Sequence, residues 1–160
     1  MGIKLSLFAS RQLPVVTANF AGEVIVNDYF VDLVAGDLDL NDTVDLGTLP
    51  GYHTITDAIL IPDDLDSGGS PALTLDIGLM SGTPGDSDAA RTVGTELFAA
   101  STAGQGGTVT RLAAKAAFLI KPVAYDRSIG VKIAAAPATK AAGRLRLRTF
   151  MTAAEPALQF

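Results

Sequence analysis

Two stretches of the chain alternate between apolar and polar or small residues, and this period of two constrains the fold more than any other feature. In residues 72–80 the apolar side chains share one side of an extended strand, and they are Leu73, Leu75, Ile77 and Leu79. Residues 144–151 alternate again, with Leu145 and Leu147 on one side and Arg144, Arg146 and Arg148 on the other. Because successive side chains of a strand point to opposite faces, both patterns predict half-buried antiparallel strands whose leucines and isoleucine point inward.

Short β-rich runs separated by turn residues fill most of the remaining chain. We expect a hairpin closed by Asn27 and Asp28, between strands at residues 24–26 and 29–34. Further strands are expected at residues 44–46, 53–61, 92–99, 116–123 and 128–135. The helical candidates, residues 88–98 and 111–118, are short and rich in residues that strands or loops also accept. Roughly seven to nine short strands without a long amphipathic helix favour a β-sandwich or a barrel.

The length of 160 residues fits one domain. We expect residues 20–160 to form a single β-sandwich domain. Residues 1–19 precede the first clear strand pattern, and we expect them to form an N-terminal arm that is either mobile or docked on a partner. The apolar stretches are far shorter than the roughly 20 residues that a transmembrane helix needs, so no membrane partner is expected.

Charge is divided unequally along the chain. Between Arg11 and Arg91 lie 79 residues with 14 carboxylates and no Lys or Arg, whereas residues 91–148 carry ten Lys or Arg against Glu96 and Asp126. If the two halves reach different surfaces, the resulting patches of opposite sign can steer the protein onto a partner or a second copy. We therefore expect an interface formed by Arg144, Arg146 and Arg148. The alternative is a solvated strand whose charges prevent edge pairing.

The overall charge argues against one class of partner. A net charge of −5 and few aromatic residues do not match the basic, aromatic-bearing surfaces that bind nucleic acids. We therefore expect no nucleic-acid partner.

Residues suited to a metal site or to catalysis occur, but none completes a motif. Asp63, Asp64 and Asp66 could offer oxygen ligands to calcium. The helix-loop-helix calcium template fails there, because Leu75 stands where the bidentate Glu should be. His53 is the one histidine, no Gly-x-Ser-x-Gly elbow holds a nucleophile, and the chain has no Cys. We expect no catalytic site, no metal and no cofactor, and hence a non-enzymatic protein.

Residues 41–79 carry a characteristic succession of short motifs. Residues 41–51 read Asn-Asp-Thr-Val-Asp-Leu-Gly-Thr-Leu-Pro-Gly, and an apolar strand, an Asp-Leu-Asp loop and a Leu-Asp-Ile-Gly strand follow. This succession resembles small structural proteins encoded beside the capsid genes of tailed bacteriophages. The resemblance implies an all-β fold, an antiparallel β-sandwich of jelly-roll type, and a place in the virion, and it carries over no active-site residues.

The function that we expect from this resemblance is that of a capsid decoration or cement protein. Such a protein would bind the major capsid protein on the outside of the head shell and stabilise the shell, as a symmetric oligomer for which a trimer is favoured. It would be made in the host cytoplasm and end on the capsid surface of the virion. Two alternatives stay open: another virion component, such as a head fibre or tail protein, and a carbohydrate-binding or adhesion module. The second alternative would need two of Tyr29, Tyr52 and Tyr125 coplanar on one exposed face.

Overall fold

A computed structural model describes residues 3–15, 17 and 22–154. Its strands are β1 (Ile3–Leu5), β2 (Val24–Leu33), β3 (Thr43–Leu49), β4 (His53–Pro62), β5 (Thr74–Met80), β6 (Phe98–Ser101), β7 (Thr110–Arg111), β8 (Arg127–Ala135) and β9 (Gly143–Ala153). The helical elements are α1 (Lys115–Phe118) and the 3-10 turns η1 (Ala35–Asp37) and η2 (Ala103–Gln105). Strands thus dominate the fold, as the period of two predicts.

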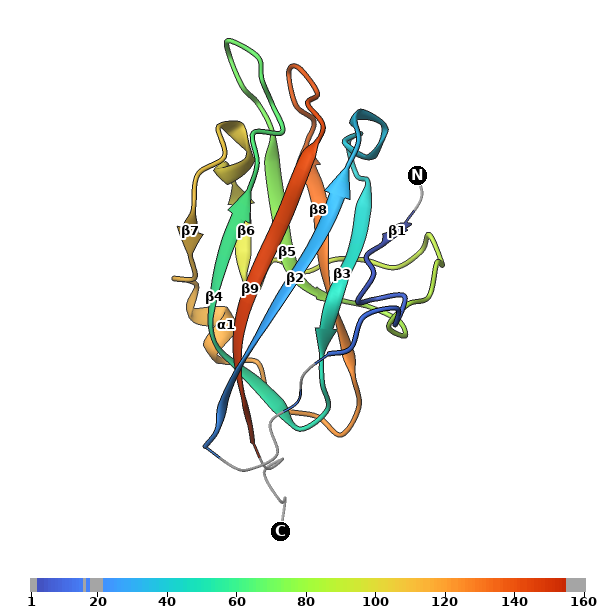
Figure 1. Ribbon diagram of the computed structural model, residues 1–160, viewed down its shortest axis with the longest axis vertical. Coiled ribbons are helices and arrows are strands. Elements are labelled where there is room, and N and C mark those ends of the chain that lie inside the picture. Colours follow the sequence, from blue (N-terminus) through green and yellow to red (C-terminus); the bar gives the residue numbers. More distant parts are fainter. Residues whose placement is uncertain (1–2, 16, 18–21, 155–160) are drawn as a thin grey trace.

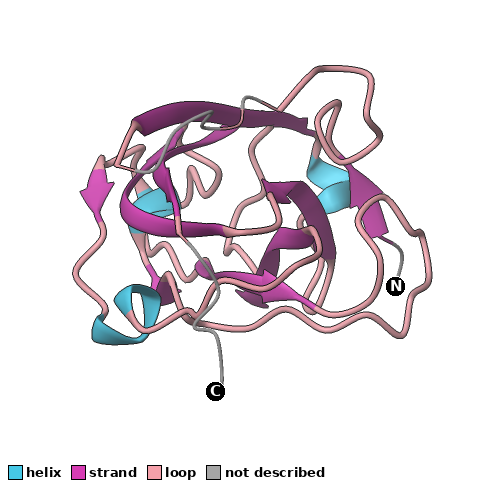
Figure 2. Cartoon of the chain, turned by 90° about the horizontal axis from the view of Figure 1, so that it is seen from below, coloured by secondary structure: helices cyan, strands magenta, loops and turns pink. Residues whose placement is uncertain are grey.

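The strands form two sheets that face each other (Figure 1). The four-stranded sheet, in front, has the order β2-β9-β4-β7, and the five-stranded sheet has the order β1-β3-β8-β5-β6. Neighbouring strands run antiparallel except β1 and β3, which are parallel. Seen from below, the strands surround a shared interior (Figure 2). The protein is therefore mostly β and built from two packed sheets, as expected.

The core lies between the sheets and contains most of the leucines that the alternation singled out. The fully buried members are Leu73, Leu75, Ile77, Leu145 and Leu147. Leu79 departs from the expected pattern, because it is only partly buried, although it packs against the same core. Its neighbour Met80 is buried instead and pairs with Val93 in an isolated β-bridge. Part of β5 is therefore covered on its outer side as well.

Residues 24–33 form one continuous strand, β2, rather than the expected hairpin. The prediction of a turn at Asn27 and Asp28 was wrong because the inward period of two runs through both residues without a break. Asn27 is buried between Ile25 and Tyr29, two residues away on either side, and these neighbours are buried too. The whole of β2 pairs with β9 in one unbroken register. Long-range pairing thus overrides the local turn propensity.

Two other expected strands take different conformations. Of residues 92–99, only the last two belong to a strand, because β6 begins at Phe98. Residues 116–123 contain the end of the short helix α1 instead of a strand. The sequence Ala-Ala-Lys-Ala-Ala at residues 113–117 explains the helix, since alanine has the highest helix propensity.

The N-terminal arm packs against its own sandwich over much of its described part. β1 adds a parallel strand beside β3. Phe8 then sets its ring edge-to-face against the rings of Tyr29 and Phe30, at centroid distances of 5.1 and 5.5 Å, and Ala9 is buried. The arm therefore links the two sheets where β1 and β2 form their edges. Residues 1–2, 16 and 18–19 of the arm lie outside the described part, and docking of the arm on a partner stays a prediction.

The two ends of the sandwich differ in their connections (Figure 1). The β2–β3, β4–β5 and β8–β9 loops gather at one end, which we call the loop end. At the other end the described chain stops at Ala154, whose N–H donates to the carbonyl oxygen of Tyr52 in the β3–β4 turn. None of the described helices has the length and apolar character needed to span a bilayer.

Candidate interaction surface

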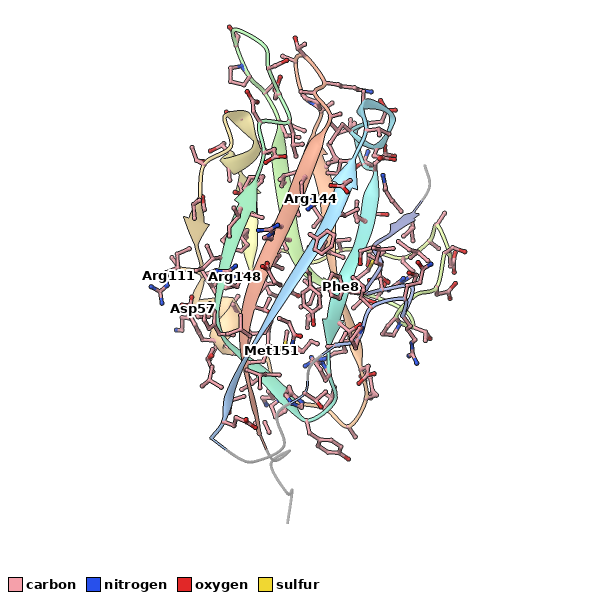
Figure 3. All side chains as sticks on the ribbon, viewed as in Figure 1. Phe8, Asp57, Arg111, Arg144, Arg148 and Met151 are labelled. Carbon is pink, nitrogen blue, oxygen red and sulfur yellow. The ribbon has the colours of Figure 1, made fainter. Side chains whose placement is uncertain are left out.

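The outer face of the four-stranded sheet holds the three arginines of the expected interface. Alternation along β9 turns its leucines into the core and its arginines outward, as expected. β2 flanks β9 on one side and β4 flanks it on the other. The register with β2 sets Asp32 opposite Arg144, Phe30 opposite Arg146 and Asp28 opposite Arg148. In Figure 3, Arg144 and Arg148 lie over the front sheet, along β9.

Arg144 is bound by its own chain. Its Nε and Nη2 donate to the two carboxylate oxygens of Asp32 at 2.7 and 2.9 Å, a forked geometry that suits a guanidinium and a carboxylate. The guanidinium carbon also lies 4.7 Å from the centre of the Phe30 ring. The hydrogen bonds from Arg144 lower the pKa of Asp32, and the same bonds raise the pKa of Arg144. Because the pair is exposed to water, it contributes little net stability.

Arg148 and Arg146 share one carboxylate, that of Asp28. Nη2 of Arg148 donates to Oδ2 at 3.0 Å. Nε of Arg146 lies 3.7 Å from Oδ1, and both of these atoms are buried without a hydrogen-bond partner in the described part of the chain. The three arginines are therefore not equivalent, because two are hydrogen-bonded to carboxylates and the third has unused donors.

The unequal division of charge along the sequence is partly neutralised by ion pairs within the fold. Seven ion pairs join described residues, and six of them link a carboxylate from residues 28–57 to a cation from residues 91–148. These six are Asp45–Arg91, Asp57–Arg111, Asp39–Lys140, Asp32–Arg144, Asp28–Arg146 and Asp28–Arg148. Figure 3 shows Asp57 and Arg111 at the β7 edge of the front sheet. The sheet face thus carries interleaved charges rather than a single patch of one sign.

Away from the loop end, the same face becomes uncharged on β2 and β9. Val24 pairs with Thr152, and Val26 pairs with Phe150 in the next outward row. The two valines are 56% and 46% exposed. An apolar area beside paired charges has the composition of an interface centre with a polar rim. This area and the arginine rows together form the candidate interaction surface.

A shallow depression of about 660 Å³ lies on this face near the loop end. Apolar side chains of Val34 and Ile61 contribute to its wall, whereas the side chain of Leu33 is 2% exposed and belongs to the core. The charged groups Arg146 and Asp63 line the same depression. It therefore offers a concave, mixed apolar and charged contact.

On the outer side of the five-stranded sheet, the loop between β5 and β6 is fixed by a buried ion pair. Nη1 of Arg91 donates to Oδ2 of Asp45 on β3 at 2.7 Å, and both side chains are at least 97% buried. Nη2 of Arg91 donates to Ser128 on β8 at 2.7 Å, and Ser128 in turn donates to Asp45. Sequence reasoning did not find this cluster, because nothing in the spacing of its members marks a contact.

The candidate calcium ligands do not converge on a metal site. Asp66 is buried, and its carboxylate accepts the backbone N–H groups of Ala72, Leu73, Ala138 and Thr139. Asp63 accepts the backbone N–H of Arg144 instead, and Asp64 accepts that of Asp66. Burial alone would raise the pKa of Asp66, but the four donated hydrogen bonds outweigh it and hold this pKa well below its ordinary value. Within the described ranges, no three His, Cys, Asp or Glu side chains are grouped to hold a metal ion.

The remaining candidates for catalysis or sugar binding are His53 and the three tyrosines. His53 is buried at the start of β4, where its Nδ1 lies 2.7 Å from the carbonyl oxygen of Gly51. Tyr29 is buried, its hydroxyl donates to the carbonyl oxygen of Thr48 at 2.6 Å, and burial raises its pKa. Tyr52 and Tyr125 are exposed, but the ring contacts between described residues are made by Phe8 and not by this pair. With Tyr29 buried, an aromatic platform for a sugar would have to rest on Tyr52 and Tyr125 alone.

Comparison with solved structures identifies the family. A chain in the structure of the capsid of Ralstonia phage GP4 shares 43% sequence identity and superposes with a TM-score of 0.92. The match covers 96% of this chain and 99% of that chain. The chain belongs to a family of phage capsid proteins. The resemblance seen in residues 41–79 is thereby confirmed.

A second solved structure supports the fold of this capsid protein. The capsid asymmetric unit of cyanophage Pam1 contains a chain with 24% identity and a TM-score of 0.67, covering 88% of this chain and 91% of that chain. No protein-family model matches the chain, and a search of curated proteins gives no match either. The protein is a component of phage capsid assemblies, which is consistent with a structural rather than an enzymatic role.

Proposed function

We propose that the protein is a decoration or cement protein that binds the outside of the phage head shell and stabilises it. The observation that carries the proposal is the correspondence over nearly the full length of both chains to a protein in a phage capsid. The match covers 96% of this chain and 99% of that chain. A small two-sheet protein of this kind suits attachment to a shell that other subunits build.

The character of the surface supports attachment rather than construction of the shell. Obligate subunit interfaces bury about 2,000–5,000 Å² and resemble an apolar core cut in half. In the described residues, the exposed large hydrophobic side chains Leu40, Val109 and Tyr125 lie on three different connections, away from the apolar area at Val24 and Val26. The sheet face itself is occupied by ion pairs. Such a surface remains compatible with water until the protein meets its shell.

The proposed scaffold is a jelly roll, and the strand pairing supports it. Four antiparallel pairs are nested along the chain: β2 with β9, β3 with β8, β4 with β7, and β5 with β6. Successive pairs belong alternately to the two sheets. One long hairpin, folded over so that its pairs alternate between two sheets, has this order, and eight strands in two sheets are typical of a jelly roll. β1 is then an addition at one edge.

In the proposed arrangement, a symmetric oligomer contacts the major capsid protein through the outer face of the four-stranded sheet. The ion pairs fix the positions of Arg144 and Arg148 before docking, so these charges affect the rate of encounter more than the final affinity. Repeated contacts at equivalent places on a shell add through avidity even when each contact is weak. A head fibre or tail component is the nearest alternative within the virion.

The proposal is tested with phage heads that lack the protein. Purified protein is added to these heads, the particles are separated by sedimentation, and bound protein is located by electron microscopy. We expect density on the outer shell surface and a higher temperature of head disruption. Density inside the shell or on the tail, or heads that disrupt at an unchanged temperature, would contradict the decoration role.

The arginine face is tested in the same assay. The triple variant Arg144→Glu, Arg146→Glu and Arg148→Glu should stay folded by circular dichroism, because these side chains lie outside the core. It should bind heads more slowly than the wild type in low salt, where charge effects are least screened. A variant with Arg11→Glu, Lys115→Glu and Lys121→Glu, three exposed cations outside β9, changes the net charge equally and serves as the control. If both variants bind at the wild-type rate, the arginines belong to a solvated face only.

A further inference from the structure

The strand β2 forms one edge of the four-stranded sheet and is ten residues long. In the described part of the chain, the other three sheet edges are formed by β1, β6 and β7, which have three, four and two residues. Short edge strands, charges and prolines are devices that prevent pairing with a further strand. β2 is long, and Val24, Ile25 and Val26 at its beginning carry neither a charge nor a proline ring. The beginning of β2 therefore has the properties of an edge that accepts another strand.

The hydrogen bonds of β9 show which backbone groups of β2 face this edge. The carbonyl oxygen of Arg144 on β9 accepts the N–H of Asp63, which directly follows β4. Even-numbered residues of β9 therefore bond to the β4 side, and odd-numbered ones bond to odd-numbered partners on β2. The even-numbered residues of β2 are left with N–H and C=O groups that point away from the sheet. The carbonyl oxygen of Asp32 agrees with this, because it accepts Nζ of Lys4 from the arm at 2.8 Å.

The arm reaches only the second half of this edge, where Phe8 packs against Tyr29 and Phe30. The edge-facing residues of the first half are Val24, Val26 and Asp28. Their outward backbone groups make no hydrogen bond to any other described residue. The two valine side chains are 56% and 46% exposed. Gly22, with a φ of 84°, allows the chain to turn immediately before this segment. The free edge is therefore residues 24–28, and Val26 is its centre.

We propose that two copies of the chain pair through this free edge, with residues 24–28 of each β2 running antiparallel about a two-fold axis at Val26. In this register Val26 lies opposite its own counterpart, and Val24 of each copy lies opposite Asp28 of the other. Each of these pairs exchanges both of its backbone hydrogen bonds, as in any antiparallel ladder. The two four-stranded sheets then continue into one another through an isologous contact. The inference rests on the symmetric oligomer of the proposed function, and it assigns a two-fold contact where the sequence led us to expect a trimer.

The distribution of charge favours a second copy in this register. Asp28 is the charged residue of the segment, and it meets the uncharged Val24 rather than its own counterpart. The two Asp28 residues are about 13 Å apart along the strand direction, since they are offset by four positions. Each carboxylate also keeps its own cations, Arg146 and Arg148. Pairing thus brings no like charges together.

The same contact joins the apolar areas of the two copies. Side chains of Val24 and Val26 lie on the outer face of the front sheet, where each is about half exposed in one copy. Across the axis these valines become cross-strand and diagonal neighbours, which are the contacts that stabilise a sheet. A second copy also supplies a free strand of matching length. The apolar area and the free edge are therefore covered by one occupant.

The test uses the purified full chain and measures its self-association by analytical ultracentrifugation. Wild-type protein should show a concentration-dependent monomer–dimer equilibrium. Val26→Lys and Val26→Glu should each weaken dimerisation at least tenfold, because like charges then lie directly opposite each other at the axis. An equimolar mixture of the two variants should dimerise again, because lysine now meets glutamate. Val34→Lys and Val34→Glu, which change another valine that is 56% exposed, are the matched controls and should dimerise like the wild type.

Cross-linking tests the register separately, since the chain contains no Cys. In a hydrogen-bonded antiparallel pair the Cα atoms are about 5.5 Å apart, which a disulfide can span. Val26→Cys should therefore give a covalent dimer on mild oxidation. Val24→Cys should not, because Val24 is offset from its counterpart by four positions, about 13 Å along the strand. Equal cross-linking of the two variants would contradict the register.

The inference is overturned by a wild-type chain that stays monomeric at all concentrations, by Val26 variants that dimerise normally, or by a mixture that does not recover. Circular dichroism confirms folding, and Val26→Arg with Val26→Asp replaces a pair that does not fold. Head binding is measured separately. Wild-type protein that dimerises but does not attach to heads contradicts the proposed function alone, whereas monomeric wild-type protein that attaches contradicts the two-fold contact alone. Val26 variants that dimerise normally but no longer bind heads would assign the free edge to a strand of a shell subunit.

Discussion

Arg91 and Asp45 form an ion pair beneath the protein surface, with 2.7 Å between Nη1 and Oδ2. The same guanidinium donates to the carbonyl oxygens of Ser81 and Asp86, each at 2.6 Å. One side chain therefore holds both the beginning and the middle of the β5–β6 loop against β3. The loop is fixed to the sheet by charge rather than by apolar packing.

Replacing Arg91 by Ala should destabilise the fold by about 3–5 kcal/mol, because the carboxylate of Asp45 is left buried without its cation. Urea unfolding monitored by circular dichroism measures this loss. The double variant Arg91→Ala with Asp45→Ala should lose less than the sum of the two single variants, because it leaves no uncompensated charge. Additive losses would show that the two residues contribute independently.

Leu75→Ala should lower the free energy of unfolding by about 2–5 kcal/mol, because the side chain is fully buried in the core and its removal leaves a cavity. Leu40→Ala is the matched control, since Leu40 is 55% exposed and surface changes fall within about 0.5 kcal/mol. Chemical denaturation of both variants provides the comparison. Equal losses would mean that the core does not include Leu75.

Asp66→Asn should lower the melting temperature at neutral pH, because the neutral amide is a weaker acceptor for the four backbone N–H groups. In the wild type the pKa of Asp66 is depressed by folding. Its contribution to stability is therefore complete above the ordinary aspartate pKa of about 3.9 and is lost as the pH falls further toward the folded-state pKa. Melting curves between pH 6 and about pH 2 should show a flatter acid dependence for the variant. If the melting temperatures of the wild type and the variant fell equally with falling pH, this account would be contradicted.

Treatment with a chelator should leave the melting temperature unchanged. The carboxylate of Asp66 is already saturated by backbone donors, and Asp63 and Asp64 accept backbone N–H groups of different segments. Melting curves with and without chelator, and after readdition of calcium, check this directly. A fall of many degrees that calcium reverses would identify a cation site at these three residues.

The parts of the fold that the sequence predicted are those where one physical signal acts alone. Strict alternation predicted the buried faces of β5 and β9, because a half-buried strand leaves few other solutions. The hairpin at Asn27 and Asp28 was wrong because turn propensity is local, whereas β2 is held by a partner more than 100 residues away. The helix α1 lies within the helical candidate at residues 111–118, and it overlaps the start of an expected strand because alanine favours a helix.

The candidate site was predicted in part. Alternation placed Arg144, Arg146 and Arg148 on an outer face, but their partners Asp28 and Asp32 were not identified. A signal was present, since the spacing of four between Asp28 and Asp32 equals that between Arg144 and Arg148. Matching spacings on two strands indicate a shared register only once the strands are known to pair. The distinct state of Arg146 depends on side-chain geometry, which residue spacing does not encode.

The pairing of β2 with β9 also sets when the fold can be completed. About 110 residues of chain separate the end of β2 from the start of β9. At roughly 5–20 residues per second, a ribosome needs on the order of 5–20 s to make that length. During this time β2 lacks its partner strand, and its residues Asp28 and Asp32 lack the arginines of β9. A chain cut short before β9 would lack both the centre of the front sheet and the three arginines of the candidate interaction surface.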